Sequence, residues 1–314
     1  MPAGMHFVLK SGDIYCDLVA TYIYSVARDR HRKVTHLTYA DRVRNVVPTL
    51  KRSPMTTISI PIRKIEPQAI LLCAFRILWI AIPLLFLLPL HLIWHLLKLP
   101  SPWAMLFLRI AARAMGARVR VHGSPLRRDV FFVANHVSWH DIPILAGITG
   151  SAFVAQDGVR DWPVIGWLAK LNRTIFISRT EKQNVAQQVS ELREAIAENW
   201  SVTLFPEGTT SDGRVLLPFK QSLFQTLAPP PRPMMIQPVL LDFGINGPDI
   251  AWLGEETGWE SAWRAFTRPG SYDVDVHFLK PFDPGALADR KVVCALARER
   301  LATALSAKLG YNVT

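Results

Sequence analysis

The sequence predicts an α/β domain with a mixed, partly parallel sheet of about seven strands flanked by helices, preceded by a membrane-docking helical hairpin. Three observations lead to this prediction. Seven short apolar segments follow one another after residue 117, an amphipathic segment lies between two of them, and a 21-residue segment before them carries no charge. Strands that alternate with helices are typical of parallel or mixed sheets. An uncharged segment of this length can reach across a hydrocarbon core.

The composition is that of a folded, basic protein. Hydrophobic residues make up 50% of the 314 residues, which is enough for a sizeable core. An excess of 36 Lys and Arg over 25 Asp and Glu suits nucleic acid, an anionic membrane face or a phosphorylated substrate. The cysteines Cys16, Cys73 and Cys294 are widely separated, so we expect neither a disulfide framework nor a zinc site. We therefore expect no metal and a reducing compartment.

Residues 1–66 form a polar, irregular segment without a sustained apolar period. Such a segment cannot join a hydrophobic core. We expect it to be a poorly ordered N-terminal tail.

The uncharged segment Ile77–Leu97 is followed by a second apolar stretch, Trp103–Ala117. One long helix could span the bilayer, or two helices could dip into one leaflet. The prolines Pro83 and Pro89 favour the dipped pair, and a helix pair buried in a soluble protein is the third alternative. Basic residues on both flanks predict that both ends face the cytoplasm. We assign residues 67–117 to membrane docking.

The seven apolar segments have the length and composition of strands. They are Val119–His122, Val130–Ala134, Phe153–Ala155, Thr174–Ser178, Val202–Phe205, Gln237–Leu241 and Val274–Leu279. Between the fourth and the fifth, Glu181–Asn199 carries apolar residues at spacings of three and four, which is typical of an amphipathic helix. A similar stripe predicts a last helix over Leu287–Leu309. We expect residues 118–314 to form the α/β domain.

The second predicted strand ends in a turn that carries His136 and, five positions later, Asp141. A histidine can accept a proton near neutral pH, and a carboxylate about one helical turn away can hold its imidazole in one tautomer. The chain contains no G-x-S-x-G pentapeptide that would supply a serine nucleophile. His136 would therefore have to activate a hydroxyl group of the substrate. The alternative is a structural, hydrogen-bonded histidine.

Two further strand ends carry groups that suit an anion. The segment RTIFISR delivers Arg179 just past the end of an apolar strand, and FPEGTTSDG carries Glu207, Gly208 and Thr209 after another. A glycine beside backbone amides and hydroxyl groups lets the backbone approach a phosphate or an oxyanion. Lys220 adds a cation shortly afterwards. The alternative for the glycine-containing segment is an ordinary surface loop.

Four segments together resemble the glycerolipid acyltransferase family. They are NHVSWHD at 135–141, RTIFISR at 173–179, FPEGTTSDG at 205–213 and IQPV at 236–239, in the order and at the spacing of the family's four sequence blocks. The resemblance covers Val119–Leu279. It implies that His136 is the general base and that Asp141 orients it. It also implies that the acceptor's anionic head group is bound by Arg179 and the Glu207–Gly208 turn, beside Thr209 and Lys220.

The resemblance implies transfer of a fatty acyl group from acyl-coenzyme A or acyl-carrier protein to the free hydroxyl of a lysophospholipid. The expected acceptor is 1-acyl-glycerol-3-phosphate, which gives phosphatidic acid. Lyso-ornithine lipid is the alternative, since Trp162–Leu171 is similar to bacterial members that acylate that lipid. Beyond the thioester co-substrate no cofactor is expected. The partners would be the lysolipid, the thioester donor and the bilayer, and the location the bacterial inner membrane with the catalytic domain facing the cytoplasm.

Two positions depart from the family pattern. Arg173 stands where the second block usually opens with glycine, and Ser222 replaces a glycine that often follows the Phe-Lys pair. An extra arginine could favour a different anionic head group. A rival from another class is a non-catalytic membrane lipid-binding protein. Nucleic-acid binding is disfavoured because the basic residues are scattered along the chain.

Overall fold

The structure is a computed structural model. It describes residues 66–99, 101–160, 165–177, 190, 192–194, 196–197, 199, 201–254, 256–287 and 289–313. These residues lie within one compact unit, Ile65–Thr314. Apart from Glu66, the predicted N-terminal tail lies outside the described residues, as do Arg179 and most of the predicted helix Glu181–Asn199.

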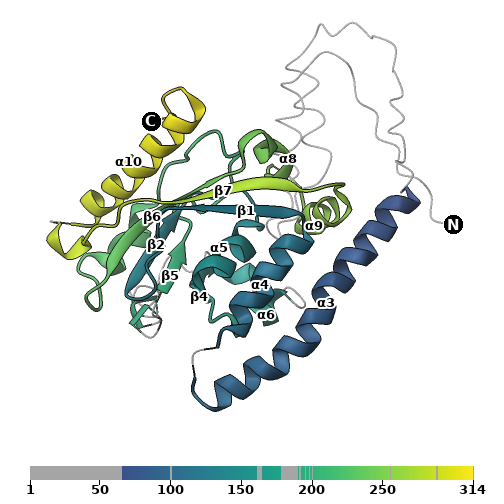
Figure 1. Ribbon diagram of the computed structural model, residues 1–314. Helices are drawn as coiled ribbons and strands as arrows, with labels where there is room; N and C mark the ends of the chain where they lie inside the picture. Colours follow the sequence, from purple (N-terminus) through teal and green to yellow (C-terminus); the bar gives the residue numbers. More distant parts are fainter. Residues whose placement is uncertain are drawn as a thin grey trace, which may run out of the picture. The chain divides into compact units, whose positions relative to one another are not determined.

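The described part contains strands and helices in alternation (Figure 1). The strands are β1 (Ala117–His122), β2 (Val130–Ala134), β3 (Ala152–Gln156), β4 (Ile175–Ile177), β5 (Ser201–Leu204), β6 (Met235–Asp242) and β7 (Tyr272–Phe278). The α-helices are α3 (Pro67–Leu96), α4 (Trp103–Ala114), α5 (Asp141–Thr149), α6 (Ile165–Leu171), α8 (Gly247–Ile250), α9 (Gly258–Thr267) and α10 (Arg290–Leu309), and the longest 3-10 helix is η3 (Gln221–Leu227). Each of the seven predicted strands is thus confirmed, with small shifts at the ends.

The strands form one seven-stranded sheet in the order β1-β7-β6-β2-β5-β3-β4. Neighbouring strands run parallel except for β6 and β7, which are antiparallel. The predicted mixed, partly parallel sheet is confirmed. Because β2 lies between the parallel strands β5 and β6, its carboxyl end meets theirs at one edge of the sheet.

Strand β2 is buried on both faces, which explains why its sequence is a continuous apolar run. Phe131 and Val133 point into a core formed with α10 and η3. Val130 and Phe132 point into a second core formed with α4 and α5. The alternation follows from the period of two in a strand. Figure 1 shows α10 on one side of the sheet and α4 and α5 on the other.

Helix α3 is the long apolar helix that the sequence predicts, and it runs without a break through Pro83 and Pro89. Its length and composition are sufficient to cross a membrane, and most of its side chains are exposed. Arg76 is the exception, with 4% exposure. Its guanidinium donates hydrogen bonds to the carbonyl oxygens of Ala265 and Gly270, at 2.7 and 3.1 Å. These bonds tie α3 to the end of α9.

Helix α4 is the second apolar helix, and it is packed against the domain. Phe107, Ala111 and Ala112 are buried on one face. Arg109 donates two hydrogen bonds to the carbonyl oxygen of Gly147 in α5, at 3.1 and 2.9 Å. A Cβ at Gly147 would lie 3.0 Å from the backbone of Arg109, so any larger residue would push the two helices slightly apart. The expected pair of helices is present, with the second forming part of the domain's core.

Helix α9 has no counterpart in the sequence prediction, although its start carries a clear signal. Thr257 accepts a hydrogen bond from the Glu260 amide, and the Glu260 carboxylate accepts one from the Thr257 amide. This is a capping box, which the T-x-x-E spacing encodes. Of the predicted helix Glu181–Asn199, residues 190, 192–194 and 196–197 are described and helical, and Leu192 and Ile196 are buried.

Replacing Gly123, directly after β1, tests how closely the end of β1 packs against the end of β7. Its φ is 80°, and a Cβ there would collide with the carbonyl oxygen of Phe278 in backbone that cannot easily move. We expect Gly123→Ala to lower the free energy of unfolding by roughly 2–4 kcal/mol, measured by urea denaturation. Gly270→Ala is the matched control, because Gly270 has a φ of 75° but open space around it. Equal losses in the two variants would contradict the packing argument.

Candidate active site

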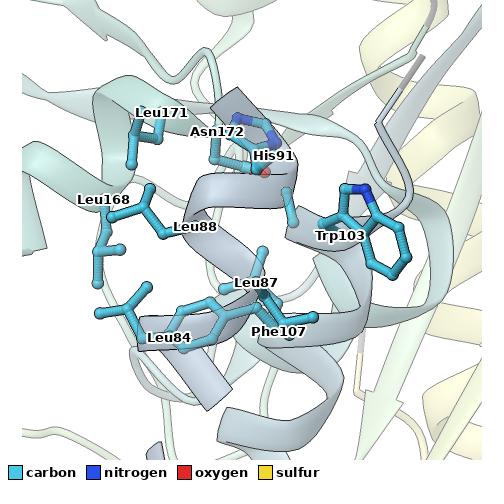
Figure 2. A pocket seen from close by; sticks show the side chains of 11 residues that line it. Leu84, Leu87, Leu88, His91, Trp103, Phe107, Leu168, Leu171 and Asn172 are labelled. Carbon is cyan, nitrogen blue, oxygen red and sulfur yellow. The ribbon is translucent and has the colours of Figure 1, made fainter. Parts of the chain in front are cut away.

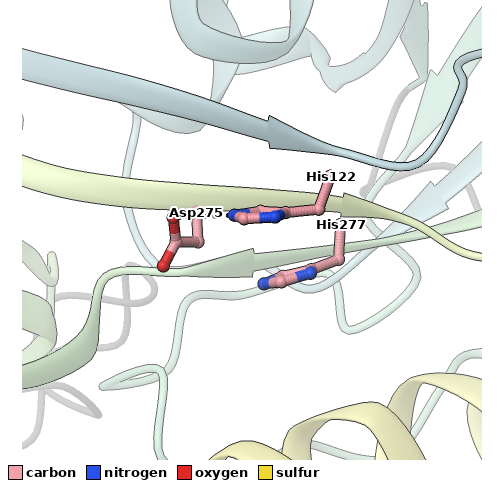
Figure 3. Close-up of side chains that lie close together, drawn as sticks. All are labelled: His122, Asp275 and His277. Carbon is pink, nitrogen blue, oxygen red and sulfur yellow. Dashed lines mark hydrogen bonds and ion pairs between the residues drawn. The ribbon is translucent and has the colours of Figure 1, made fainter.

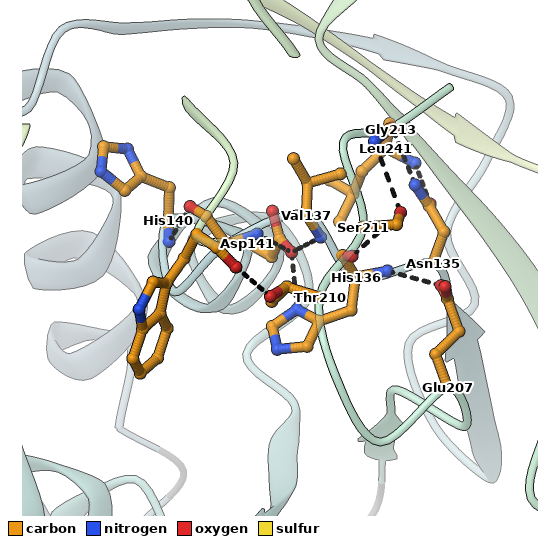
Figure 4. Close-up of polar contacts among 12 residues, drawn as sticks. Asn135, His136, Val137, His140, Asp141, Glu207, Thr210, Ser211, Gly213 and Leu241 are labelled. Atoms are coloured by element: carbon orange, nitrogen blue, oxygen red, sulfur yellow. Dashed lines mark hydrogen bonds and ion pairs between the residues drawn. The ribbon is translucent and has the colours of Figure 1, made fainter. Parts of the chain in front are cut away.

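Two loops meet at the carboxyl edge of the sheet, one after β2 and one after β5. The two strands are neighbours and parallel, with Val133 opposite Leu204. His136 follows the end of β2 by two residues and Glu207 follows the end of β5 by three, so both loops start from the same edge. Figure 4 shows the side chains of His136, Asp141 and Glu207 in this region.

Asp141 organises the turn between β2 and α5. Its side chain is fully buried, and one oxygen, Oδ2, accepts three hydrogen bonds. The donors are Nδ1 of His136 at 2.7 Å, the Val137 amide at 2.7 Å and the Ser138 amide at 3.0 Å. Asp141 is also the first residue of α5, where the helix dipole favours a negative charge. The predicted pairing of His136 with Asp141 is therefore present in the structure.

The hydrogen bond to Asp141 fixes the state of the His136 ring. Because the carboxylate can only accept, Nδ1 carries a proton, and in the neutral ring Nε2 is then the nitrogen with the lone pair. The ring lies flat on Phe205, with 4.1 Å between the ring centroids and 13° between the planes. Its side chain is 19% exposed. Nε2 is thus the basic nitrogen of a ring that is fixed in orientation and still partly open to solvent.

Glu207 holds the two loops together. It is buried, and its two carboxylate oxygens accept from the His136 amide at 2.9 Å and from the Leu217 amide at 3.0 Å. Burial raises the pKa of Glu207 to about 7, although the two amide hydrogen bonds oppose the rise. Both oxygens are therefore used inside the protein, so the position of Glu207 is that of a brace between loops.

The loop after Glu207 is bonded directly to the histidine turn. The Ser211 amide donates to the His136 carbonyl oxygen at 2.8 Å, and the Trp252 amide donates to the Val137 carbonyl oxygen at 3.0 Å. Thr210 completes the connection, because its hydroxyl donates to the carbonyl oxygen of Trp252. The backbone on each side of the histidine is held by these bonds.

Asn135 fixes the same turn from the opposite side. Its amide group donates to the Leu241 carbonyl oxygen at 3.0 Å and accepts from the Leu241 amide at 2.8 Å. Leu241 belongs to β6, the strand next to β2. Neither Asn135 nor Ser211 was assigned a role from the sequence. The only signal for Asn135 would have been a polar residue at the end of an apolar, buried run, and Ser211, within the polar segment TTSDG, carries no such signal.

Gly208 and Lys220, two of the predicted binding residues, lie together. Gly208 has a φ of 66°, and a Cβ at this position would overlap the end of the Lys220 side chain. The Lys220 amide also donates to the Pro206 carbonyl oxygen at 2.9 Å. Lys220 and Thr209 are exposed. The glycine turn therefore carries a cation at the edge of the sheet where His136 lies, while Arg179 falls outside the described residues.

Arg173, which replaces the family's glycine, has a φ of 55°. It ends α6 in a Schellman motif: its amide donates to the Lys170 carbonyl oxygen and the Thr174 amide to that of Ala169. The left-handed conformation explains why glycine is usual here, since it costs other residues about 1–2 kcal/mol. The arginine is kept in a conformation that favours glycine.

The second histidine of the first block, His140, is a structural residue. It is 2% exposed, and its Nδ1 lies 2.6 Å from the hydroxyl of Tyr272. Burial, with the nearby positive charges of Arg264, Arg268 and Arg76, lowers the pKa of His140 to about 3. Its imidazole is neutral at physiological pH. Of the two histidines, His136 is the one that faces an open site.

His122, Asp275 and His277 form the group of side chains in the described part that could hold a metal ion (Figure 3). Their ligand atoms lie within 4.8 Å of one another on β1 and β7. Asp275 accepts hydrogen bonds from His122 and Arg120, at 2.9 and 2.8 Å. The Arg120 guanidinium thus already neutralises the carboxylate. β6 separates these strands from β2, so the group is distinct from the histidine turn.

Comparison with known families matches residues 118–242 to the acyltransferase family model. The chain belongs to this family, and it is an acyltransferase. It is 37% identical over 226 residues to a lyso-ornithine lipid O-acyltransferase of Rhizobium meliloti, an alignment that covers 67% of this chain and 76% of the relative. A Brucella abortus protein of the same name is 34% identical over 241 residues, covering 69% and 88% of the two chains.

Two further similarities concern enzymes named for another lipid. A 1-acyl-sn-glycerol-3-phosphate acyltransferase of Neisseria gonorrhoeae is 34% identical over 117 residues, covering 37% of this chain and 46% of the relative. The crystal structure of the 1-acyl-sn-glycerophosphate acyltransferase PlsC from Thermotoga maritima matches with a TM-score of 0.55 and 20% identity. That match covers 76% of this chain and 95% of the other. It confirms the predicted fold.

The buried Glu207 leads to a pH-dependent stability. The folded protein binds its proton more tightly than the unfolded chain, whose pKa lies near the ordinary 4.5. Its contribution to the free energy of unfolding is therefore complete at low pH, falls as the pH rises through about 7, and is constant above. We expect the difference in free energy of unfolding between the wild type and Glu207→Gln, measured by urea denaturation, to decline between about pH 5 and pH 8. A flat difference would contradict the assigned pKa.

Proposed function

We propose that the protein is a lysolipid O-acyltransferase in which His136 acts as the general base. Its Nε2 removes the proton from the acceptor's hydroxyl as that oxygen attacks the thioester carbonyl. The tetrahedral intermediate then expels the thiolate, which takes the proton back from the imidazolium, so that an ester and a free thiol are formed. The observation that carries this proposal is the 2.7 Å bond from His136 Nδ1 to buried Asp141, which leaves Nε2 as the proton acceptor.

Asp141 has two roles in this mechanism. It holds the tautomer in which Nε2 is unprotonated, and its negative charge stabilises the imidazolium that forms during the attack. A thioester is already activated, so no acyl-enzyme is needed. General base catalysis, worth roughly 10²- to 10⁴-fold, acts together with the orientation of the two substrates.

Two acceptors are supported. Lyso-ornithine lipid is the substrate in the names of the two longest matches described above, each of which covers about two thirds of this chain. 1-acyl-glycerol-3-phosphate is the substrate in the name of a shorter match and of the structural neighbour. Among the sequence matches, the greater coverage of the two lyso-ornithine lipid enzymes favours lyso-ornithine lipid, with 1-acyl-glycerol-3-phosphate as the second candidate.

The head group of the acceptor would be bound beside the glycine turn. Lys220 and Gly208 lie together there, and Thr209 is exposed on the same turn. Because the glycine has no Cβ, the Lys220 side chain can lie against the turn and place its positive charge there, which suits a phosphate or carboxylate. Arg179, which ends the second sequence block, completes the proposed set. Glu207 would act through these residues by holding the loop.

The donor would be acyl-coenzyme A or acyl-carrier protein, and no other cofactor is involved. Helix α3 would attach the enzyme to the bacterial inner membrane. An exposed apolar helix of 30 residues is unfavourable in water, and burial in lipid removes that cost. The catalytic domain would face the cytoplasm, where thioester donors are made.

Replacing His136 tests the general base. We expect His136→Ala to lower acyl transfer by roughly 10²- to 10⁴-fold, with product formation measured in detergent micelles, while a cooperative melting transition shows that the variant is still folded. His122→Ala is the control, because His122 lies in the separate group on β1 and should remain fully active. Normal turnover by His136→Ala would reject the base, and a non-catalytic lipid-binding protein would give no turnover in the wild type.

Replacing Asp141 tests both its role in orienting His136 and its contribution to the stability of the fold. Asp141→Asn keeps the size of the side chain but places a neutral amide where three donors meet. We expect a large loss of kcat through the wrong tautomer and the missing charge. We also expect the free energy of unfolding to fall by about 1–3 kcal/mol, because the buried NH2 group of the asparagine finds no acceptor in this turn. Full activity would show that the carboxylate has no part in the reaction.

Parallel assays with lyso-ornithine lipid and 1-acyl-glycerol-3-phosphate identify the acceptor. We expect the higher kcat/KM with lyso-ornithine lipid. Arg179→Lys should raise the KM for the preferred acceptor and leave the KM for the donor unchanged, since a lysine cannot form paired hydrogen bonds with a planar anion. Unaltered acceptor kinetics would place the head group elsewhere.

A further inference from the structure

Helices α3 and α6 end at the same basic pocket. Its lining combines His91, Leu92, His95 and Leu99 at the end of α3 with Ser101, Lys170, Leu171 and Arg173. None of these lining residues is acidic. Lys170 and Arg173 therefore give the pocket a positive potential that suits an anion.

An apolar pocket adjoins the basic one. It shares His91 and Leu171 with the basic pocket, and its other walls are leucines and aromatic rings of α3, α4 and α6. Figure 2 shows Leu84, Leu87, Leu88, Trp103, Phe107 and Leu168 around this space. A basic chamber beside an apolar one matches a lipid with an anionic head and a hydrocarbon chain.

Two cations at this corner stand in backbone conformations that favour glycine. Lys98 has a φ of 54° and Arg173 a φ of 55°. Each is the residue after the cap of its helix in a Schellman motif: the Lys98 amide donates to His95 and the Leu99 amide to Trp94, as Arg173 and Thr174 do at the end of α6. Asp129 is the remaining non-glycine residue of the described part with a positive φ. Of the other two, Arg173 lines the basic pocket, and Lys98 directly precedes Leu99, which also lines it.

The helix dipole gives a competing explanation for part of this charge. Cations in a last helical turn compensate the negative C-terminal end, and this accounts for His95 and Lys170. It does not account for Lys98 and Arg173, because glycine would cap the same carbonyls with less strain. Strained residues that persist indicate a use for the side chain.

We propose that the ends of α3 and α6 form a binding site for an anionic phospholipid of the bilayer. The phosphodiester is bound by Arg173, Lys170 and His95, with Lys98 beside it, and one acyl chain lies in the adjoining apolar pocket. This inference rests on the proposed attachment of α3 to the membrane. The site would fix the depth and orientation of the enzyme on an anionic leaflet, separately from the turn that carries His136.

The test uses the full chain in micelles of a neutral detergent. It is titrated with phosphatidylglycerol or phosphatidylcholine of identical acyl chains, and the rise in melting temperature gives an apparent affinity. We expect tighter binding of phosphatidylglycerol by the wild type. Arg173→Gly and Lys98→Gly should each weaken it about fivefold, while their melting temperatures without lipid stay equal to the wild type or rise.

Lys291→Gln is the matched control, because it removes one positive charge from exposed α10, which lines neither pocket. Equal weakening in Lys291→Gln and Arg173→Gly would mean general electrostatic attraction and would overturn the site. Unchanged affinity for phosphatidylglycerol in both glycine variants would also overturn the site. A lower melting temperature of these variants without lipid would overturn it as well, because it would support the dipole explanation.

Two further arms separate the remaining alternatives. Inorganic phosphate that produces the same rise in melting temperature as phosphatidylglycerol would indicate a site for a free anion and overturn the lipid assignment. An increased KM for the lysolipid in Arg173→Gly, with unchanged phosphatidylglycerol binding, would place the acyl acceptor here instead. Absence of acyl transfer by the wild type in the same micelles would reject the proposed function without affecting the lipid titration.

Discussion

One carboxylate oxygen, Oδ2 of Asp141, is the point on which the geometry of the site depends. A fully buried carboxylate requires donors, since leaving such a charge unpaired costs several kcal/mol. Three donors meet this requirement within one turn of the chain, and one of them is the ring of His136. The two backbone donors are available only because the chain leaves β2 and enters α5 at this place. The orientation of the imidazole is therefore built into the backbone turn.

The same turn is held by elements that arrive from both neighbouring strands. Glu207, after β5, accepts from the His136 amide, and Asn135 is paired with Leu241 of β6. The sheet edge thus acts as a rigid frame, and the side chain that would do chemistry stands on loops braced against it. Such bracing lets a base keep its orientation without reorganising during the reaction.

The long apolar helix α3 presents a different physical problem. A long apolar helix has no preferred rotation in lipid, yet the domain attached to it must face its substrates. The buried Arg76 restrains α3 by bonding two carbonyl oxygens at the end of α9. Just after the other end of α3, Lys98 stands in a backbone conformation that favours glycine, and Arg173 does the same at the end of α6. Arg76 therefore bonds the helix to the domain, and Lys98 places a positive charge at the end of the helix.

The sequence by itself determined the seven strands, the long apolar helix and the pairing of His136 with Asp141. Each depends on short-range pattern: apolar runs of strand length, an uncharged stretch and a five-residue spacing. It did not determine that α4 packs on α5, because the same apolar residues suit a lipid phase and a protein core equally well. Only tertiary structure decided the partners of Asn135 and Ser211. Their hydrogen bonds join positions 106 and 75 residues apart, and no local periodicity encodes a contact at that range.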